Sequence, residues 1–568
     1  MRRIAEKYTN AHIARAVSCA LHESGAAAGW THGVAWALLA GGGLVHAATF
    51  TVTSAGDPGT GGMSLRQAVV QANGVPNSVV QFDPALVGST ITLASGEIAI
   101  SAPMRIQGPG SSKLAISGNN ISRVFNIVGN ASTPVAVTVA GVALTDGHSA
   151  SNGGALTAAD AVLTISDAAI RNSHAIQCGG VAALRSAVAF TNVQFLNNGA
   201  ADKFGAFCLA GYAHATGTIS DSVVSGNHAF ANGGGDIEQF AAFAIKRSRI
   251  SGNLASSEVG GLSIRRVGAA KMTFYLGDST ISDNVAASGD AGGLELQGVY
   301  AVVVNAVISG NTANSGGGIL LADAAGAAYP ATSTLEIYTS TISGNSANYF
   351  GGGIDVRNVN QITIRESLIS GNAVSAPSGG GGGIALRGTL GDALIFTSTI
   401  YGNYSYRRGG GIGILDAGAG SHTRLVFDTI AGNAAYDDSS GIFGSGMPVL
   451  DSCIVANNAS HLTTQDLAGT FTTNFSLIKT PGSAAFNGDD NFFGFDPSLG
   501  PLAVNGGSTR SLLPSATSVV LNVGDPAFTS ASVRDQRGLP RESGGRADIG
   551  AVERQSPEEI IFRNGFGS

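Results

Sequence analysis

The chain has 568 residues, of which 82 are glycine, and only 12% are charged, about half the usual share for a soluble domain. The net charge of −7 disfavours nucleic acid or an anionic membrane as a partner, because both need a basic protein surface. Apolar residues at 44% exclude a disordered polyelectrolyte, and glycine without a three-residue period excludes collagen. Abundant glycine with scarce charge predicts short strands joined by tight turns in a repeat.

Residues 1–47 have the features of a secretory leader. Arg2 and Arg3 give a basic start, an apolar run covers Gly33 to Leu39, and Val45 to Ala47 offers a small-residue cleavage site. The run is too short and too rich in glycine to span a membrane. We therefore expect export, and no transmembrane helix after the leader is removed.

Residues 48–110 are expected to form an N-terminal cap and the first strands. Thr49 to Ser54 alternates as a strand does, and Ser64 to Ala68 followed by Ala72-Asn73 has the pattern of an amphipathic helix. A solenoid needs such a cap because its end strands otherwise expose edges that can pair with other chains.

Residues 111–475 carry a repeat whose first signature is an apolar residue, two variable residues and an asparagine. The signature returns about every 29 residues. Stacked asparagines can hydrogen-bond along a ladder, and asparagine tolerates a left-handed backbone, so we expect these residues to form a structural ladder at one corner. The predicted ladder residues are Asn198, Asn227, Asn253, Asn284, Asn311, Asn345, Asn372, Asn403, Asn433 and Asn457.

The second signature is a glycine cluster followed by an apolar residue, as in Gly292-Gly293-Leu294 and Gly351 to Ile354. Short β-branched stretches such as Gln361 to Arg365 lie between the signatures. One repeat of this length cannot bury its own apolar face, whereas stacked repeats make a continuous core. The predicted fold is all-β, a single-stranded right-handed parallel β-helix with N- and C-terminal caps. The right hand is expected because crossover connections between parallel strands are almost always right-handed.

A column of small hydroxyl residues supports this register. It lies five residues before seven of the ladder asparagines and should line the inside of one corner. Asp428 interrupts the column, which we interpret as a local error of alignment, with a buried active-site acid as the alternative. The members are Ser222, Ser248, Ser279, Ser340, Ser367, Ser398 and Ser452.

Cys178, Cys208 and Cys453 are the cysteines that follow the leader. The first two are about one repeat apart, so a bridge between adjacent turns is one possibility. Extended strands would separate them by roughly 13 Å along the chain direction, which is too far for a disulfide without a bend. We therefore expect an unbridged pair and keep the disulfide as the alternative.

Residues 476–555 are expected to form a C-terminal cap and 556–568 a tail. The cap contains five charged residues whose expected role is a salt-bridge cluster that holds it, with a calcium site as the alternative. They are Asp535, Arg537, Arg541, Asp548 and Glu553.

These motifs resemble those of bacterial secreted proteins with a pectin-lyase-like β-helix. The repeat resembles that of polymorphic outer-membrane proteins, and the N-terminal segment resembles the one named after Cys-Ser-Leu-Arg-Glu-Ala, with Met63 and Gln67 in place of its Cys and Glu. Asp496 to Leu502 and Asp535 to Arg541 are similar to the choice-of-anchor Q region of surface proteins. The resemblance implies a protein secreted by, or displayed on the outer membrane of, a Gram-negative bacterium.

Charged residues after the glycine corner are the candidates for chemistry, because outward positions stack across turns. We align one column as Glu238, Ser263, Glu295, Leu320, Asp355 and Ala385, and the next as Arg265, Gln297, Ala322, Arg357 and Arg387. A glycan groove would use Glu238, Arg265, Glu295, Arg357 and Arg387, and catalysis would use Glu295, Asp355 and Arg357. The competing interpretation is a solvated face on which opposite charges pair.

No metal site and no cofactor is expected beyond the calcium alternative. Glycoside hydrolysis needs two carboxylates, and a polysaccharide lyase needs a base near a bound cation. The six histidines after the leader do not have the spacing of metal ligands. These residues are His148, His174, His214, His228, His422 and His461.

The expected function is therefore a non-catalytic one, adhesion to or contact with cell-surface or extracellular polysaccharide, or a structural role in the envelope. The alternative is an enzyme, a polysaccharide lyase or glycoside hydrolase acting on an acidic polysaccharide.

Overall fold

The structure is a computed structural model that describes residues 47–59, 61–268, 270–323, 333–388, 390–415, 421–437, 440–461, 465–528, 533–541 and 543–555. The described residues belong to two compact units, which we call the N-terminal unit (47–289) and the C-terminal unit (290–555). The tail 556–568 and all but the last residue of the predicted leader lie outside the described residues.

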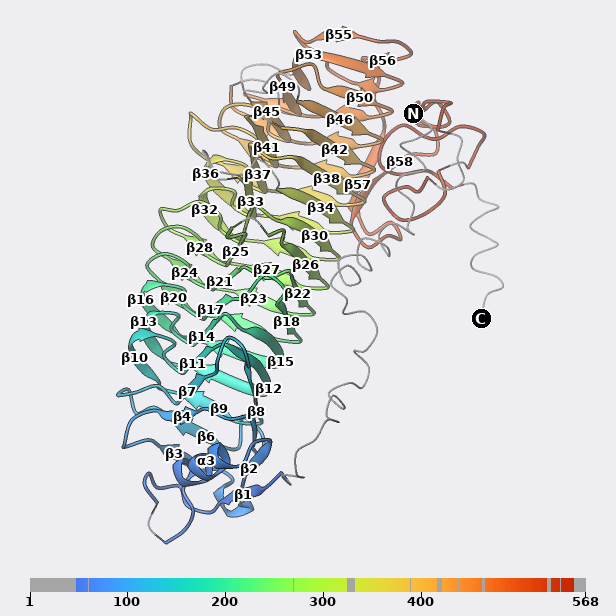
Figure 1. Cartoon of the computed structure of the whole chain (residues 1–568). Helices are drawn as coiled ribbons and strands as arrows, with labels where there is room; N and C mark the ends of the chain where they lie inside the picture. Colours follow the sequence, from blue (N-terminus) through green and yellow to red (C-terminus); the bar gives the residue numbers. More distant parts are fainter. Residues whose placement is uncertain are drawn as a thin grey trace, which may run out of the picture. The chain divides into compact units, whose positions relative to one another are not determined.

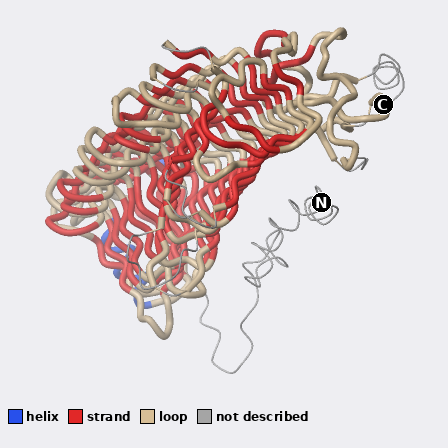
Figure 2. The backbone as a smooth tube through the Cα atoms, turned by 90° about the horizontal axis from the view of Figure 1, so that it is seen from above, coloured by secondary structure: helices blue, strands red, loops and turns tan. Residues whose placement is uncertain are grey.

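Both units are parallel β-solenoids (Figure 1). Most complete turns have four faces with one strand on each, and in a few turns one long strand covers two faces. In one turn, face 1 is β37 (Ile354–Arg357), face 2 is β38 (Gln361–Arg365), face 3 is β39 (Leu368–Ser370) and face 4 is β40 (Ala373–Val374). Each strand pairs in parallel with its counterpart in the next turn, so that Ile354 lies opposite Ile384. Figure 2 shows these strands running side by side, and the predicted parallel β-helix is confirmed.

In the N-terminal unit, face 1 comprises β4 (Ile98–Ile100), β7 (Phe125–Val128), β11 (Leu156–Ala159), β14 (Val181–Leu184), β17 (Phe207–Ala210), β21 (Gly235–Glu238) and β25 (Leu262–Arg265). Face 2 comprises β1 (Thr49–Val52), β2 (Ser78–Phe82), β5 (Met104–Gln107), β8 (Val135–Ala140), β18 (Thr216–Ser220), β22 (Ala242–Lys246) and β26 (Thr273–Gly277). Face 3 comprises β3 (Thr90–Thr92), β6 (Ala115–Ser117), β9 (Ala143–Thr145), β19 (Val223–Ser225), β23 (Arg249–Ser251) and β27 (Thr280–Ser282). Two long strands, β12 (Ala161–Arg171) and β15 (Ala187–Leu196), cover faces 2 and 3. Face 4 comprises β10 (His148–Asn152), β13 (His174–Gln177), β16 (Gly199–Lys203), β20 (His228–Ala229), β24 (Leu254–Ala255) and β28 (Val285–Ala286).

In the C-terminal unit, face 1 comprises β29 (Leu294–Gln297), β33 (Ile319–Ala322), β37, β41 (Ile384–Arg387), β45 (Ile412–Leu415) and β49 (Ile442–Gly444). Face 2 comprises β30 (Tyr300–Val304), β34 (Thr334–Tyr338), β38, β42 (Asp392–Phe396), β46 (His422–Val426), β50 (Val449–Asp451) and β55 (Ala485–Asn487), while β53 (Leu467–Asn474) covers faces 1 and 2. Face 3 comprises β31 (Val307–Ser309), β35 (Thr341–Ser343), β39, β43 (Thr399–Tyr401), β47 (Thr429–Ala431), β51 (Ile454–Ala456), β54 (Leu477–Ile478) and β56 (Phe492–Phe493). Face 4 comprises β32 (Thr312–Ser315), β36 (Ser346–Phe350), β40, β44 (Tyr404–Ser405), β48 (Ala434–Ala435) and β52 (Ala459–Ser460).

The core of each turn is a stack of branched aliphatic side chains. Ile354 and Val356 of face 1, Ile362 and Ile364 of face 2, and Ile369 of face 3 are all buried. Because alternate residues of a strand point to opposite sides, these five side chains face inward and meet the equivalent residues of neighbouring turns. A single turn could not exclude water from these groups, which is why the fold needs repeats.

The glycine cluster makes the corner before face 1, as predicted. Gly351 takes a left-handed backbone with φ +59°, where a side chain would be strained. Gly352 has another reason to be glycine, because a Cβ there would lie 2.5 Å from the carbonyl oxygens of Ala373 and Gly382. Glycine is therefore needed at Gly351 for the left-handed backbone and at Gly352 because neighbouring turns approach closely.

The ladder asparagines form continuous hydrogen-bonded columns. The backbone N–H and Nδ2 of Asn345 donate to Oδ1 of Asn372 at 3.0 and 2.9 Å, and Nδ2 also donates to the carbonyl of Ile308. The expectation that these asparagines themselves are left-handed is wrong. The residue before each one takes that conformation, such as Gly371 with φ +63°, which frees the asparagine side chain to point into the ladder.

The prediction that Asn457 is the last asparagine of the ladder is also wrong, by one residue. Oδ1 of Asn458 accepts from the backbone N–H of Asn433 at 2.9 Å, whereas Asn457 takes the left-handed position with φ +59°. The ladder then ends on Asp466, whose Oδ1 accepts from the backbone N–H of Asn458 at 3.0 Å. The motif Ile454 to Asn457 misled the alignment because two asparagines stand side by side.

The same shift corrects the hydroxyl column. Cys453 occupies the place assigned to Ser452, and its N–H donates to Oγ of Ser476 at 3.0 Å. Asp428 is in register after all, because its Oδ1 accepts from the N–H of Ser398 at 2.8 Å as a serine would. A buried carboxylic acid therefore replaces one serine of this column, and no alignment error is involved.

The beginning of the N-terminal unit contains the predicted strand and helix. The helix α3 (Leu65–Gly74) starts with a capping box between Ser64 and Gln67, and it packs against β1, β2 and β4. The short 3-10 helix η1 (Pro84–Leu86) follows β2. No helix formed by the described part of the chain combines the length and hydropathy that crossing a bilayer demands.

The C-terminal segment packs on the flank of its own unit as well as on its last turns. Residues 499–514 form an antiparallel pair, β57 (Leu499–Ala503) and β58 (Ser511–Pro514). The N–H of Ala551 donates to Oγ1 of Thr429 at 2.9 Å, and Thr399 donates to Oε1 of Gln536 at 2.5 Å. Val520 and Ile549 add apolar contacts near the last turns.

Cys178 and Cys208 form a disulfide, with a Cα–Cα distance of 5.3 Å, so the expectation of an unbridged pair is wrong. The distance argument assumed an extended chain, but Cys178 takes the left-handed corner position with φ +57°. The chain bends there and brings the two cysteines together across adjacent turns. Cys453 is buried and unbridged.

Candidate functional site

Charged side chains gather on the outer side of face 1 in both units. The second and fourth residues of each face 1 strand point away from the core, and parallel register stacks them. We name two groups. Cluster I in the N-terminal unit consists of Asp236, Glu238 and Arg265, and cluster II in the C-terminal unit consists of Asp290, Asp355, Arg357 and Arg387.

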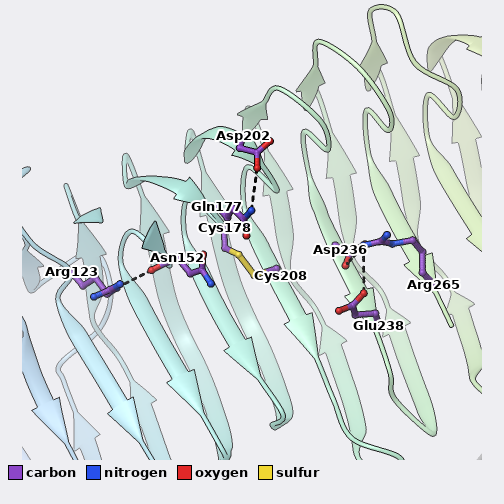
Figure 3. Close-up of a disulfide and its surroundings, with 9 residues drawn as sticks. All are labelled: Arg123, Asn152, Gln177, Cys178, Asp202, Cys208, Asp236, Glu238 and Arg265. Atoms are coloured by element: carbon purple, nitrogen blue, oxygen red, sulfur yellow. Dashed lines mark hydrogen bonds and ion pairs between the residues drawn. A yellow bond between two sulfur atoms is a disulfide. The ribbon is translucent and has the colours of Figure 1, made fainter. Parts of the chain in front are cut away.

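Cluster I is built from two adjacent strands (Figure 3). Arg265 Nε and Nη2 donate to the two carboxylate oxygens of Asp236 at 2.9 and 3.0 Å, and Nη2 also lies 3.5 Å from Oε2 of Glu238. Asp236 is buried, whereas the side chain of Glu238 keeps 27% of its surface exposed. One cation therefore faces two carboxyl groups.

The alignment of Glu238 with Ser263 is wrong, because Glu238 lies opposite Arg265 and Asp236 lies opposite Ser263. The third glycine of the cluster, Gly235, is the first residue of β21, where other turns carry a large apolar residue. A Cβ at Gly235 would lie 2.6 Å from the Phe207 ring, which fills that part of the core. Counting from the glycine cluster therefore missed Asp236.

Burial dominates the acid–base properties of cluster I. It raises the pKa of Asp236, against the opposing effect of Arg265. It also raises the pKa of Glu238, and the nearby charge of Asp236 adds to the shift. The pKa values of both carboxyl groups of cluster I are therefore shifted in the same direction, and of the two only Glu238 is partly exposed to solvent.

Cluster II is more completely neutralised. Arg387 donates to both carboxylate oxygens of Asp355 at 2.9 and 2.7 Å, and Arg357 Nε donates to Oδ2 at 2.7 Å. Arg357 also reaches Asp290 at 2.7 Å, and Arg387 stacks on the Phe350 ring. The side chain of Asp355 has no exposed surface, so it cannot touch a substrate in this conformation.

Glu295 lies on the same column as Asp355. Register places it opposite Leu320, which in turn lies opposite Asp355, so the two carboxyl groups are two turns apart as the sequence indicated. Glu295 is half-buried. Of the three candidate catalytic residues, Asp355 and Arg357 are in contact, whereas Glu295 lies two turns away from Asp355.

A cavity of about 220 Å³ lies beside cluster I. Three successive loops between faces 1 and 2 build it, the loops that follow β17, β21 and β25. Gln239 and Arg266 directly follow Glu238 and Arg265, so the cavity continues the outer edge of the cluster. The lining residues are Tyr212, Ala213, Gln239, Phe240, Arg266, Val267, Ala270 and Met272.

Sequence reasoning missed this cavity because its residues are in loops outside the repeat signatures. The signal available in the sequence was the position of Tyr212 and Phe240, two aromatic residues in loops of a chain with only 7% aromatic residues. Tyr212 is 40% exposed, so its ring is available at the surface beside the cavity. The combination of one exposed aromatic ring, one guanidinium and one amide fits a small polar ring.

The three acidic residues among the five charged residues of the C-terminal segment accept hydrogen bonds from protein donors. Arg537 pairs with Asp535 at 2.8 Å, and the carboxylate of Glu553 accepts the backbone N–H groups of Ser543 and Asp548. Arg541 is buried on the Phe427 ring, 4.1 Å from its centroid. Among the described residues no group of three or more His, Cys, Asp or Glu is arranged to hold a metal ion.

Comparison with known proteins gives structural neighbours only. No family model matches the chain, and no curated protein sequence matches it. Similar solved structures include tailspike protein 3 of bacteriophage CBA120, with a TM-score of 0.32, 7% identity, and coverage of 75% of this chain and 58% of the tailspike. Pectate lyase Pel9A has a TM-score of 0.22, 13% identity, and coverage of 90% and 98%. The A-module of the Azotobacter vinelandii mannuronan C-5 epimerase AlgE6 has a TM-score of 0.22, 11% identity, and coverage of 76% and 94%. The chain thus spans a little over half the length of the tailspike.

Proposed function

We propose that this protein is a secreted or surface-displayed β-helix that contacts an extracellular polysaccharide without cleaving it. The observation that carries the proposal is the cavity beside cluster I, where Tyr212 supplies exposed aromatic surface and Arg266 supplies a cation. Phe240 also lines the cavity, but only 2% of its surface is exposed. An aromatic face packs on the C–H groups of a sugar ring, and a guanidinium recognises a carboxylate or hydroxyl group. The chemistry favours an acidic sugar residue.

A non-catalytic role is supported by the state of the carboxyl groups. Asp355 is enclosed by two arginines, and Asp236 by one, so both are used in ion pairs. The disulfide between Cys178 and Cys208 supports export, because such bonds persist in oxidising compartments.

The proposal is tested by measuring binding of the purified chain to a panel of acidic and neutral polysaccharides. We expect retention on an acidic polysaccharide, weakened about tenfold or more by Tyr212→Ala or Arg266→Ala, with no new reducing ends or unsaturated products. Tyr349→Ala, an exposed tyrosine of the C-terminal unit, is the matched control and should bind normally. Equal binding by the two cavity variants and the control would contradict the proposal.

A second candidate is a glycoside hydrolase with Glu238 as the general acid. One observation favours it, namely the raised pKa of Glu238 beside a carboxylate that is paired with Arg265. Product formation that Glu238→Gln abolishes while binding persists would establish this activity. The same assay with Asp355→Ala tests the column that the sequence singled out, and we expect no activity to depend on it.

A further inference from the structure

Histidines line up on face 4 of the N-terminal unit. His148, His174, Gly199 and His228 are the first residues of β10, β13, β16 and β20, and parallel register places each opposite the next. The spacing of these residues in the sequence does not reveal the column, because they are one or two turns apart along the chain. They share one outward face only because the turns are stacked.

Two of these side chains meet above the backbone of Gly199. The ring centroids of His174 and His228 are 6.1 Å apart, with an interplanar angle of 60°. A Cβ added at Gly199 would lie 2.6 Å from Nε2 of His228 and 2.9 Å from Cδ2 of His174. The missing side chain of Gly199 is therefore the space in which the two imidazoles converge.

The separation of the rings suits a shared metal ion once the His174 ring is turned by 180° about its Cβ–Cγ bond, which places Nδ1 where Cδ2 lies. Metal–nitrogen bonds of about 2 Å place two imidazole centroids that bind one ion roughly 5–6.5 Å apart. Imidazole nitrogen is a preferred ligand of Zn²⁺, Cu²⁺ and Ni²⁺. We propose that His174 and His228 form a two-histidine site for a divalent transition-metal ion that links two turns across the one contributing Gly199.

The position of the pair supports the proposal. Both histidines are exposed at the surface, so an ion can reach them from solvent. Among the described residues no third His, Cys, Asp or Glu completes a larger metal-binding group. Water would fill the remaining coordination positions, so the site should exchange its ion readily.

The test is a titration of the untagged, chelator-treated full chain with ZnCl₂, and separately with NiCl₂, by isothermal titration calorimetry. We expect one ion per chain, with affinity reduced at least tenfold by His174→Gln and by His228→Gln. Gly199→Ala should have the same effect, because its methyl group occupies the space between the rings. His214→Gln, an exposed histidine of the loop after β17, is the control and should bind as the unaltered chain does.

A second measurement separates loss of the site from loss of the fold. Far-UV circular dichroism should be the same for all four variants, and the electron paramagnetic resonance spectrum of bound Cu²⁺ should show coupling to two nitrogens. If Gly199→Ala is misfolded, the two histidine variants decide the question. The proposal is overturned if the unaltered chain binds no ion, or if binding survives both histidine substitutions.

Discussion

At the scale of single residues, the outward charges of face 1 act mainly on one another. Asp355 is the clearest case, because three donor atoms of two arginines surround a carboxylate with no exposed surface. Charges withdrawn from water cost free energy unless they are paired and hydrogen-bonded. The column that the sequence suggested as catalytic is therefore first of all an ion-pair network between adjacent turns.

Replacing Asp355 should show this role. We expect Asp355→Asn to lower the free energy of unfolding by about 2–3 kcal/mol, less than for a fully buried pair because the two arginines remain partly exposed to solvent. The measurement is urea-induced unfolding followed by circular dichroism. Asp221→Asn, which removes the partner of Arg247 in an exposed pair, is the control and should change little. Equal effects of the two substitutions would show that Asp355 has no special structural role.

At the scale of elements, the corners set the register of the strands. A left-handed residue turns the chain, and the side chain that follows it hydrogen-bonds to a neighbouring turn, as in Gly371 followed by Asn372. The same device precedes the hydroxyl column, where Phe427 is left-handed and Asp428 follows it. Register is therefore specified by side-chain ladders at two corners as well as by the apolar core.

Adjacent asparagines allow a direct test of the ladder. Asn458→Ala removes the acceptor for the backbone N–H and Nδ2 of Asn433. Nδ2 keeps the carbonyls of Ile400 and Ala431, whereas the buried N–H loses its partner, so we expect a cost of about 1–3 kcal/mol. Asn457→Gly should be nearly neutral, because equivalent positions in other turns hold a left-handed glycine such as Gly432. Urea unfolding of the two variants measures the difference. A larger effect at Asn457 would place the ladder where the sequence pattern first suggested.

At the scale of the whole molecule, buried acids give the chain an unusual dependence on pH. Burial raises the pKa of Asp428 well above its usual value, that of Asp451 to about 6 and that of Glu553 to about 8. The folded chain keeps protons on these groups that the unfolded chain loses above about pH 4. Their contribution to stability is therefore complete below that pH and is lost as the pH rises through 6 to 8.

We accordingly expect the thermal unfolding midpoint to be several degrees higher at pH 5 than at pH 8. Differential scanning calorimetry at constant ionic strength measures this difference. Glu553→Gln should reduce it, since the substituted side chain no longer ionises. A midpoint that rises from pH 5 to pH 8 would contradict the assignment. Asp57, whose pKa is lowered by Arg66, is ionised in both the folded and the unfolded chain over this range and does not affect the comparison.

Sequence alone determined the repeat, because stacking requires the same residue type at the same place in every turn. The ladder asparagines from Asn198 to Asn433 and the corner at Gly351 follow from this requirement and could be recognised without a structure. Predictions from the sequence failed where a local feature breaks the period of the repeat, as with the adjacent asparagines at Asn457 and the additional glycine at Gly235. Counting residues cannot show which of two neighbours enters the ladder.

Only the tertiary structure decided how residues of different turns meet. The bend at Cys178 that permits the disulfide, the pairing of Asp236 with Arg265, and the cavity between three loops all depend on which way the chain turns at a corner. The convergence of His174 and His228 above Gly199 has the same origin. In a solenoid each turn lies a few ångströms from the next, so side chains about 26–54 residues apart in the chain become nearest neighbours. Composition specified what the turns are made of, and stacking specified which of their side chains can act together.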